Sequence, residues 1–122
     1  MAKTILVVDD SASIRQVVGI TLRGEGYEVI EACDGKDALG KMTGQKIHLI
    51  ISDVNMPNMD GISFLKEVKV NPGYKFTPVI MLTTEAGQDK MQEGRAAGAK
   101  AWLVKPFQPP QMLEAVAKLV LP

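Results

Sequence analysis

Ile47-His48-Leu49-Ile50-Ile51-Ser52-Asp53 is an apolar run that ends in a carboxylate, and the turn Val54-Asn55-Met56-Pro57-Asn58-Met59-Asp60-Gly61 follows it at once. A short apolar run bounded by turn residues is typical of a strand that is buried on both faces. The sequence therefore predicts a buried strand with Asp53 at its tip, where the carboxylate faces solvent.

Three other runs also end in a polar group. Ile5-Leu6-Val7-Val8 ends at Asp9-Asp10, and two later runs end at Thr83 and at Lys105-Pro106. In an open parallel sheet, the carboxyl ends of the strands converge on one crevice, where the strand order reverses. We therefore expect the polar groups of all four runs to meet in a single site.

The composition of this expected site suits a divalent metal ion and a phosphoryl group. Three crowded carboxylates repel one another, so they need a cation, and hard oxygen ligands without nearby Cys or His favour Mg²⁺ over zinc. Lys105 supplies a fixed positive charge and Thr83 a hydroxyl donor. Both suit a site in which the charge of an arriving phosphoryl group has to be neutralised.

Helical patterns alternate with the apolar runs, which is the signature of a parallel sheet covered on both faces. The fully apolar runs are expected at the centre of the sheet, whereas Glu28-Val29-Ile30-Glu31 carries charges at its ends and is expected at an edge. The sequence thus predicts an α/β fold of five β/α units, with strands at about 4–8, 28–31, 48–52, 78–82 and 101–104.

Capping signals mark where several helices begin. Ser13 opens a possible capping box, Asp34 and Asp60 are expected N-caps, and Pro109-Pro110 suits the first turn of the last helix. The first helix should bury a stripe of apolar residues at helical spacing, namely Ile14, Val17, Val18 and Leu22.

Length and charge limit the possible classes of protein. The chain has 122 residues, 46% of them hydrophobic, which suits one domain, and its 14 basic residues equal its 14 acidic ones. Without a basic run, a protein partner is expected rather than nucleic acid. No apolar stretch approaches the ~20 residues of a membrane span, and no signal peptide precedes the first strand, so we expect a cytoplasmic protein. The single cysteine, Cys33, has no partner for an internal disulfide.

The groups at the four strand ends resemble those of the receiver domains of bacterial two-component response regulators. The resemblance covers essentially the whole chain, and it is closest to the single-domain chemotaxis regulators of the CheY type. It implies a flavodoxin-like, doubly wound five-stranded parallel sheet of order 2-1-3-4-5. It also implies a single receiver domain over residues 1–122 with no output domain, which we expect to be a monomer. The strings that carry it are Val7-Val8-Asp9-Asp10-Ser11, Asn55-Met56-Pro57-Asn58-Met59-Asp60-Gly61 and Val104-Lys105-Pro106-Phe107.

The resemblance implies a role for each residue of the expected site. Asp53 would be the nucleophile that takes a phosphoryl group from a phosphohistidine on a partner histidine kinase. Lys105, with a cis bond to Pro106, would pair with the phosphoryl oxygens, and Thr83 would swing to hydrogen-bond one of them. Mg²⁺ would be held by Asp9, Asp10, Asp53 and the backbone carbonyl of Asn55.

The resemblance also implies a switch surface on the fourth helix and the fifth strand. Trp102 stands where the family usually has Tyr or Phe, an aromatic residue that moves inward when the threonine shifts, and its indole is larger. Asn55 and Glu85 match the residue types of fast-dephosphorylating chemotaxis regulators, which implies a short signal lifetime. The face that usually docks the flagellar motor switch protein would carry Gln88, Met91 and Arg95.

The sequence therefore predicts a stand-alone response regulator, not an enzyme, that changes its affinity for a protein partner when Asp53 is phosphorylated. Chemotaxis and control of the flagellar motor are the expected context, with a phosphatase as a further partner. A phosphorelay intermediate and a non-motor receiver module would use the same residues, and both stay open. His48, the only histidine, precedes a buried strand and is expected to be structural, so the phosphoryl donor should be another protein.

Two enzyme classes on similar folds are disfavoured. An FMN-binding flavodoxin needs a phosphate-cradling loop after the first strand, where Asp9-Asp10 would repel the phosphate. In a phosphatase of the haloacid dehalogenase type, a second Asp follows two residues after the nucleophile, whereas Asp53 is followed by Asn55.

Overall fold

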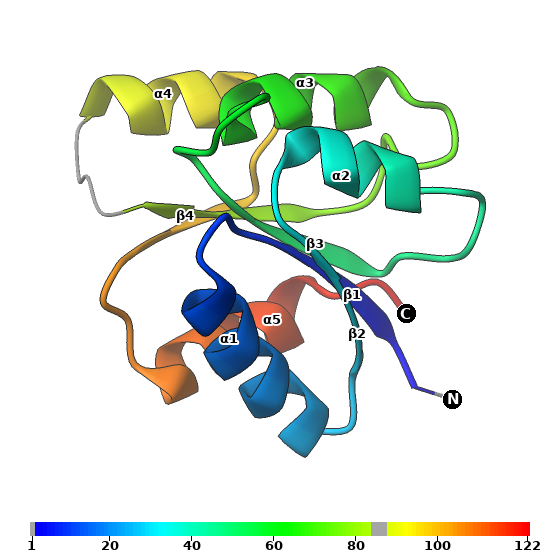
Figure 1. The fold of residues 1–122 in the computed structure, drawn as a ribbon, viewed down its shortest axis with the longest axis vertical. Coiled ribbons are helices and arrows are strands. Elements are labelled where there is room, and N and C mark those ends of the chain that lie inside the picture. Colours follow the sequence, from blue (N-terminus) through cyan, green and yellow to red (C-terminus); the bar gives the residue numbers. More distant parts are fainter. Residues whose placement is uncertain (1, 84–87) are drawn as a thin grey trace.

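Five parallel strands and five helices form three layers in the computed structural model, which describes residues 2–83 and 88–122 (Figure 1). The sheet order is β2-β1-β3-β4-β5, with α1 and α5 on one face and α2, α3 and α4 on the other. This confirms the predicted fold class and strand order. The strands are β1 (Thr4–Val8), β2 (Glu28–Ala32), β3 (Leu49–Asp53), β4 (Val79–Thr83) and β5 (Ala101–Val104). The helices are α1 (Ala12–Gly24), α2 (Gly35–Lys41), α3 (Gly61–Val70), α4 (Gln88–Ala96) and α5 (Pro109–Leu119).

The central strands carry the apolar runs 5–8, 49–51 and 79–82, because their side chains point alternately to two covered faces. In β1, Leu6 and Val8 belong to the apolar cluster beneath α2, α3 and α4. Ile5 and Val7 belong to the cluster on the side of α1 and α5. All four side chains are fully buried, as a parallel sheet covered on both faces requires. The charged strand β2 lies at the edge of the sheet, as predicted.

Two of the predicted helix caps are confirmed and one is wrong. Asp34 accepts a hydrogen bond from the backbone N–H of Asp37 at 2.8 Å, and Asp60 caps α3 in the same way. The N-cap of α1 is Ser11, not Ser13, and its hydroxyl accepts from the N–H of Ile14 at 3.3 Å. The helix begins directly after the turn that follows β1, so Ser13 already lies within its first turn.

The buried face of α1 is narrower than its apolar stripe. Val18 and Leu22 are buried and Ile14 is half-buried, but Val17 is 56% exposed, so its predicted place in the core is wrong. Successive residues of a helix point about 100° apart. Because Val18 points toward the sheet, Val17 points away from the sheet. No helix in the described parts of the chain is long and apolar enough to cross a membrane.

Candidate metal and phosphoryl site

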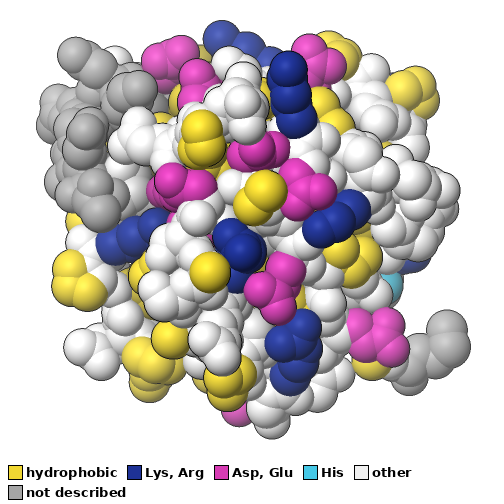
Figure 2. All heavy atoms as spheres, in the orientation of Figure 1, with side chains coloured by type: hydrophobic (Ala, Val, Ile, Leu, Met, Phe, Trp, Pro, Cys, Tyr) yellow, Lys and Arg dark blue, Asp and Glu magenta, His cyan; other side chains and the backbone are white. Residues whose placement is uncertain are grey.

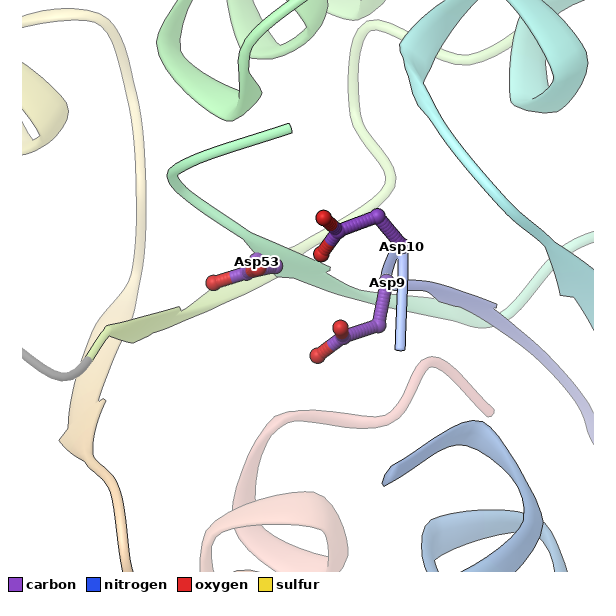
Figure 3. Close-up of side chains that lie close together, drawn as sticks. All are labelled: Asp9, Asp10 and Asp53. Atoms are coloured by element: carbon purple, nitrogen blue, oxygen red, sulfur yellow. The ribbon is translucent and has the colours of Figure 1, made fainter. Parts of the chain in front are cut away.

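The carboxyl ends of the central strands place the predicted residues at one edge of the sheet. Asp9 directly follows β1, Asp53 and Thr83 are the last residues of β3 and β4, and Lys105 directly follows β5. Figure 3 shows the side chains of Asp9 and Asp10 on one side of a gap and that of Asp53 on the other. The convergence predicted from the strand ends is therefore confirmed.

Asp9, Asp10 and Asp53 form a carboxylate cluster in which one oxygen from each residue lies within 4.8 Å of the others. Asp9 is fully buried, Asp53 is 7% exposed and Asp10 is exposed, so Asp10 forms the open side of the cluster. An all-oxygen donor set with three negative charges fits Mg²⁺ better than a softer metal ion. In Figure 2, acidic side chains gather near the middle of this face, with Lys and Arg side chains among them.

Lys105 compensates part of this negative charge. Its Nζ lies 2.7 Å from Oδ2 of Asp9 and 3.5 Å from Oδ1 of Asp53, and the side chain is 12% exposed. The other Asp9 oxygen, Oδ1, accepts a hydrogen bond from the N–H of Ser11 at 2.9 Å. Both oxygens of Asp9 are thus already engaged with protein donors. The peptide bond between Lys105 and Pro106 is cis, as predicted.

The surroundings of Asp53 oppose its ionisation. Burial and the repulsion from Asp9 raise its pKa from the ordinary value of 3.8 to about 6, although the ammonium group of Lys105 and a hydrogen bond from the N–H of Val54 act against the rise. The bond from Val54 reaches Oδ1 at 2.9 Å. At neutral pH, Asp53 is therefore an ionised carboxylate that is poorly solvated, and it gains from any cation that arrives beside it.

Thr83 is buried at the end of β4, beside the last residue of β5. It pairs in register with Val104, and its carbonyl oxygen accepts a hydrogen bond from the N–H of Lys105 at 2.7 Å. The backbone thus ties the predicted hydroxyl donor to the predicted cation.

Sequence reasoning missed two residues that shape the site. Arg15 donates from Nη1 to the backbone carbonyl of Asp9 at 2.6 Å and lies 3.6 Å from Glu31, but in sequence it looks like any cation on an exposed helix face. Gly61 is the first residue of α3, and a Cβ there would overlap the carbonyl oxygen of Asp53. The signal for Gly61 was the Asp-Gly pair that ends the turn after β3.

The remaining predicted residues are spread around the site. Asn55 is exposed in the turn two residues beyond Asp53. Gln88 begins α4, and Glu85 lies outside the described residues. The partner surface predicted on α4 and β5 includes the half-buried Met91 and Trp102 and the exposed Arg95.

His48 has a structural place, as predicted. Its Nδ1 accepts a hydrogen bond from the backbone N–H of Thr4 at 3.0 Å, and its carbonyl oxygen accepts one from Leu121. Burial, followed by the charges of Lys46 and Lys3, lowers the pKa of the imidazole.

Comparison with known proteins finds relatives over most of the chain. The sequence pattern of the response regulator receiver domain matches residues 5–117. The chain is 39% identical over 119 residues to chemotaxis protein CheY1 of Helicobacter pylori, which covers 96% of this chain and 95% of CheY1. It is 38% identical over 112 residues to protein PilG of Pseudomonas aeruginosa, covering 92% of this chain and 83% of PilG.

Solved structures agree with the sequence matches. Chemotaxis protein CheY4 of Vibrio cholerae is 50% identical, with a TM-score of 0.94 over 98% of this chain and 100% of that one. A CheY-like receiver domain protein from Methanospirillum hungatei is 31% identical, with a TM-score of 0.89 over 97% of this chain and 93% of that one.

Proposed function

This chain belongs to the response regulator receiver domain family, and from that premise we propose that it is a binding module switched by phosphorylation of Asp53 in chemotaxis signalling. Receiver domains are phosphoacceptors for histidine kinases rather than classical enzymes. The observation that carries the proposal is the placement of Asp53, a buried carboxylate with a raised pKa, 3.5 Å from Lys105 and within the acidic cluster.

In the proposed step, a carboxylate oxygen of Asp53 attacks the phosphorus of a phosphohistidine on the kinase. The P–O bond forms as the P–N bond breaks, and the leaving imidazole takes up a proton. Nζ of Lys105 pairs with the phosphoryl oxygens as they arrive beside Asp53. Asp9, Asp10, Asp53 and the carbonyl of Asn55 would hold Mg²⁺, which supplies positive charge against the phosphoryl oxygens.

The proposed output is a change in the face formed by α4, β5 and α5. The hydroxyl of Thr83 moves to hydrogen-bond the phosphoryl group. This movement of Thr83 passes to Trp102 through the paired strands β4 and β5. CheY1 and CheY4 are chemotaxis proteins by name, which supports the flagellar motor switch protein as the partner of this face. A phosphatase would reset the switch.

Chemical phosphorylation tests the acceptor. Acetyl phosphate with Mg²⁺ should add one phosphoryl group to the protein, located on Asp53 by mass spectrometry of peptides, and Asp53→Asn should not be labelled. Asp60→Asn is the matched control, because Asp60 is exposed outside the cluster and Asn also caps helices. The labelling rate should fall at acid pH, where Asp53 gains a proton, and because bound Mg²⁺ favours the ionised carboxylate, the fall should come below the metal-free pKa of about 6. Equal labelling of Asp53→Asn would place the nucleophile elsewhere.

Binding tests the output. Fragments of a histidine kinase and of a flagellar motor switch protein should be captured differently by the protein with and without beryllofluoride, which mimics the phosphoryl group. Capture of the motor fragment only with beryllofluoride supports a motor switch. Rapid passage of the phosphoryl group to a second histidine protein would instead identify a phosphorelay intermediate.

A further inference from the structure

Trp102 and Gly94 fit against each other between β5 and α4. Trp102 packs on the apolar cluster beneath α2, α3 and α4, and it is half-buried. A Cβ at Gly94 would lie 2.5 Å from Cζ3 and 3.2 Å from Cε3 of the indole, and 3.4 Å from Cδ1 of Ile62. The first distance is far inside van der Waals contact, so the fused ring of Trp102 occupies the space that any other residue at position 94 would fill.

Among the described residues, packing holds the indole in this position without a hydrogen bond. The polar atom of the ring, Nε1 of Trp102, is buried, and within the described residues it has no hydrogen-bond partner. A buried N–H without an acceptor is unfavourable, and a ring turned toward solvent would regain a bond to water. The inward position therefore depends on the contacts of the ring edge with Gly94 and the residues around it.

Glycine itself is unfavourable within a helix, because it loses more backbone freedom than alanine on folding. Gly94 lies inside α4 and is buried, with an ordinary helical backbone that does not require glycine. The open space for the ring is the feature of this position that only glycine supplies.

We propose that Gly94 is a positioning residue for Trp102: it admits the large indole beneath α4 and so makes the ring part of the path from Asp53 to the partner face. The link to Asp53 rests on the proposed function, whereas the dependence of the ring on Gly94 does not. A methyl group at position 94 should drive the indole outward and uncouple it from α4.

The emission of Trp102 reports the ring directly, because it is the only tryptophan in the chain. Gly94→Ala should shift the emission to longer wavelength and increase quenching by acrylamide. Gly40→Ala is the matched control, since Gly40 is an exposed glycine in α2 with open space where the Cβ would go. It should leave the emission unchanged and raise the Tm by about 4 °C. An emission of Gly94→Ala equal to that of the wild type would overturn the proposal.

The effect of Gly94→Ala on the Tm should have opposite signs in the wild type and in the variant Trp102→Phe. In the wild type, Gly94→Ala should lower the Tm, because the new methyl group overlaps the fused ring. In Trp102→Phe, which lacks the atoms Cε3 and Cζ3, the same change should raise the Tm, because alanine favours the helix. A change of the same sign and size in both backgrounds would show that Gly94 and Trp102 are independent.

The last comparison separates this inference from the proposed function. Asp53 of Gly94→Ala should be labelled by acetyl phosphate as in the wild type, while the change in Trp102 emission on adding beryllofluoride should become smaller. If acetyl phosphate does not label the wild type, the proposed function is contradicted. The role of Gly94 is then decided by whether the Tm change caused by Gly94→Ala reverses its sign in Trp102→Phe. If beryllofluoride changes the emission of Gly94→Ala as much as that of the wild type, Gly94 does not place the ring of Trp102 on the path from Asp53 to the partner face.

Discussion

Asp53 is held in a state that is unfavourable for folding. It is almost fully buried and faces Asp9 across the cluster, and Lys105 offsets only part of the repulsion, so its pKa is raised to about 6. A carboxyl group that binds its proton more tightly in the folded state stabilises the fold at low pH and destabilises it once ionised. The ordinary value is 3.8, so the stability should fall as the pH rises from about 4 to about 6.

We therefore predict that Asp53→Asn raises the free energy of unfolding by about 3 kcal/mol at pH 8 without Mg²⁺, because the amide carries no charge. The gain should disappear toward pH 4, where Asp53 of the wild type is protonated. Urea unfolding at several pH values measures both effects. Glu67→Gln on the exposed side of α3 is the control for the loss of one charge. A stability gain that does not vary with pH would contradict the assigned cause.

Asp10 is the member of the cluster most open to solvent, and it should control the binding of Mg²⁺. Asp10→Lys should abolish the heat of Mg²⁺ binding in a calorimetric titration, because an ammonium group would occupy the cation position. Glu67→Lys makes the same charge change at an exposed residue of α3 that is not part of the cluster, and this variant should bind Mg²⁺ as the wild type does. Saturable binding of Mg²⁺ to Asp10→Lys would show that the ion is held elsewhere.

At the scale of elements, the start of α3 is set by its approach to β3. Gly61 brings the first turn of the helix against the tip of the strand, and its N–H donates to the carbonyl of Val54 at 2.8 Å. A side chain at this position would meet the carbonyl of Asp53 and the side chain of Met81. The helix and the phosphoryl site thus share one tightly packed junction.

Gly61→Ala should therefore lower the free energy of unfolding by about 2–4 kcal/mol, which is the range of strongly disruptive substitutions. It should also slow the labelling of Asp53 by acetyl phosphate, since the strand tip has to shift. Gly40→Ala, in the open part of α2, should instead stabilise the protein by roughly 0.5–1 kcal/mol. Equal stability of the two variants in urea would contradict a close junction at Gly61.

At the scale of the whole molecule, two strands join the proposed phosphoryl site to the predicted partner face. Thr83 is the last residue of β4, at the site. Trp102 lies on β5 and pairs with Met81 of β4. A ligand at Asp53 shifts the partner face only through contacts that differ between the two states. The hydroxyl of Thr83 is the group proposed to make such a contact.

Beryllofluoride with Mg²⁺ should therefore change the emission of Trp102 in the wild type, and Thr83→Ala should reduce the change. Thr83→Ser keeps the hydroxyl and should retain most of it. Titration with Mg²⁺ before the addition ensures that the metal site is filled in all three proteins. Equal responses of the wild type and Thr83→Ala would show that the signal reaches Trp102 by another route.

Local patterns along the chain determined the element order, the edge position of β2, the caps at Asp34 and Asp60, and the strand ends that carry Asp9 and Asp53. These features depend on near neighbours in sequence and on the alternation of faces, so they can be predicted without coordinates. The strand order was implied by the family resemblance.

Tertiary structure alone decided which side chains fill space and which charges meet. It turned Val17 to solvent, brought Arg15 onto the carbonyl of Asp9, and set Gly94 against the ring of Trp102. Lys105 reaches Asp9 across 96 positions of sequence. Packing and electrostatic energies depend on distances of a few ångströms between such remote groups, and only the folded chain sets those distances.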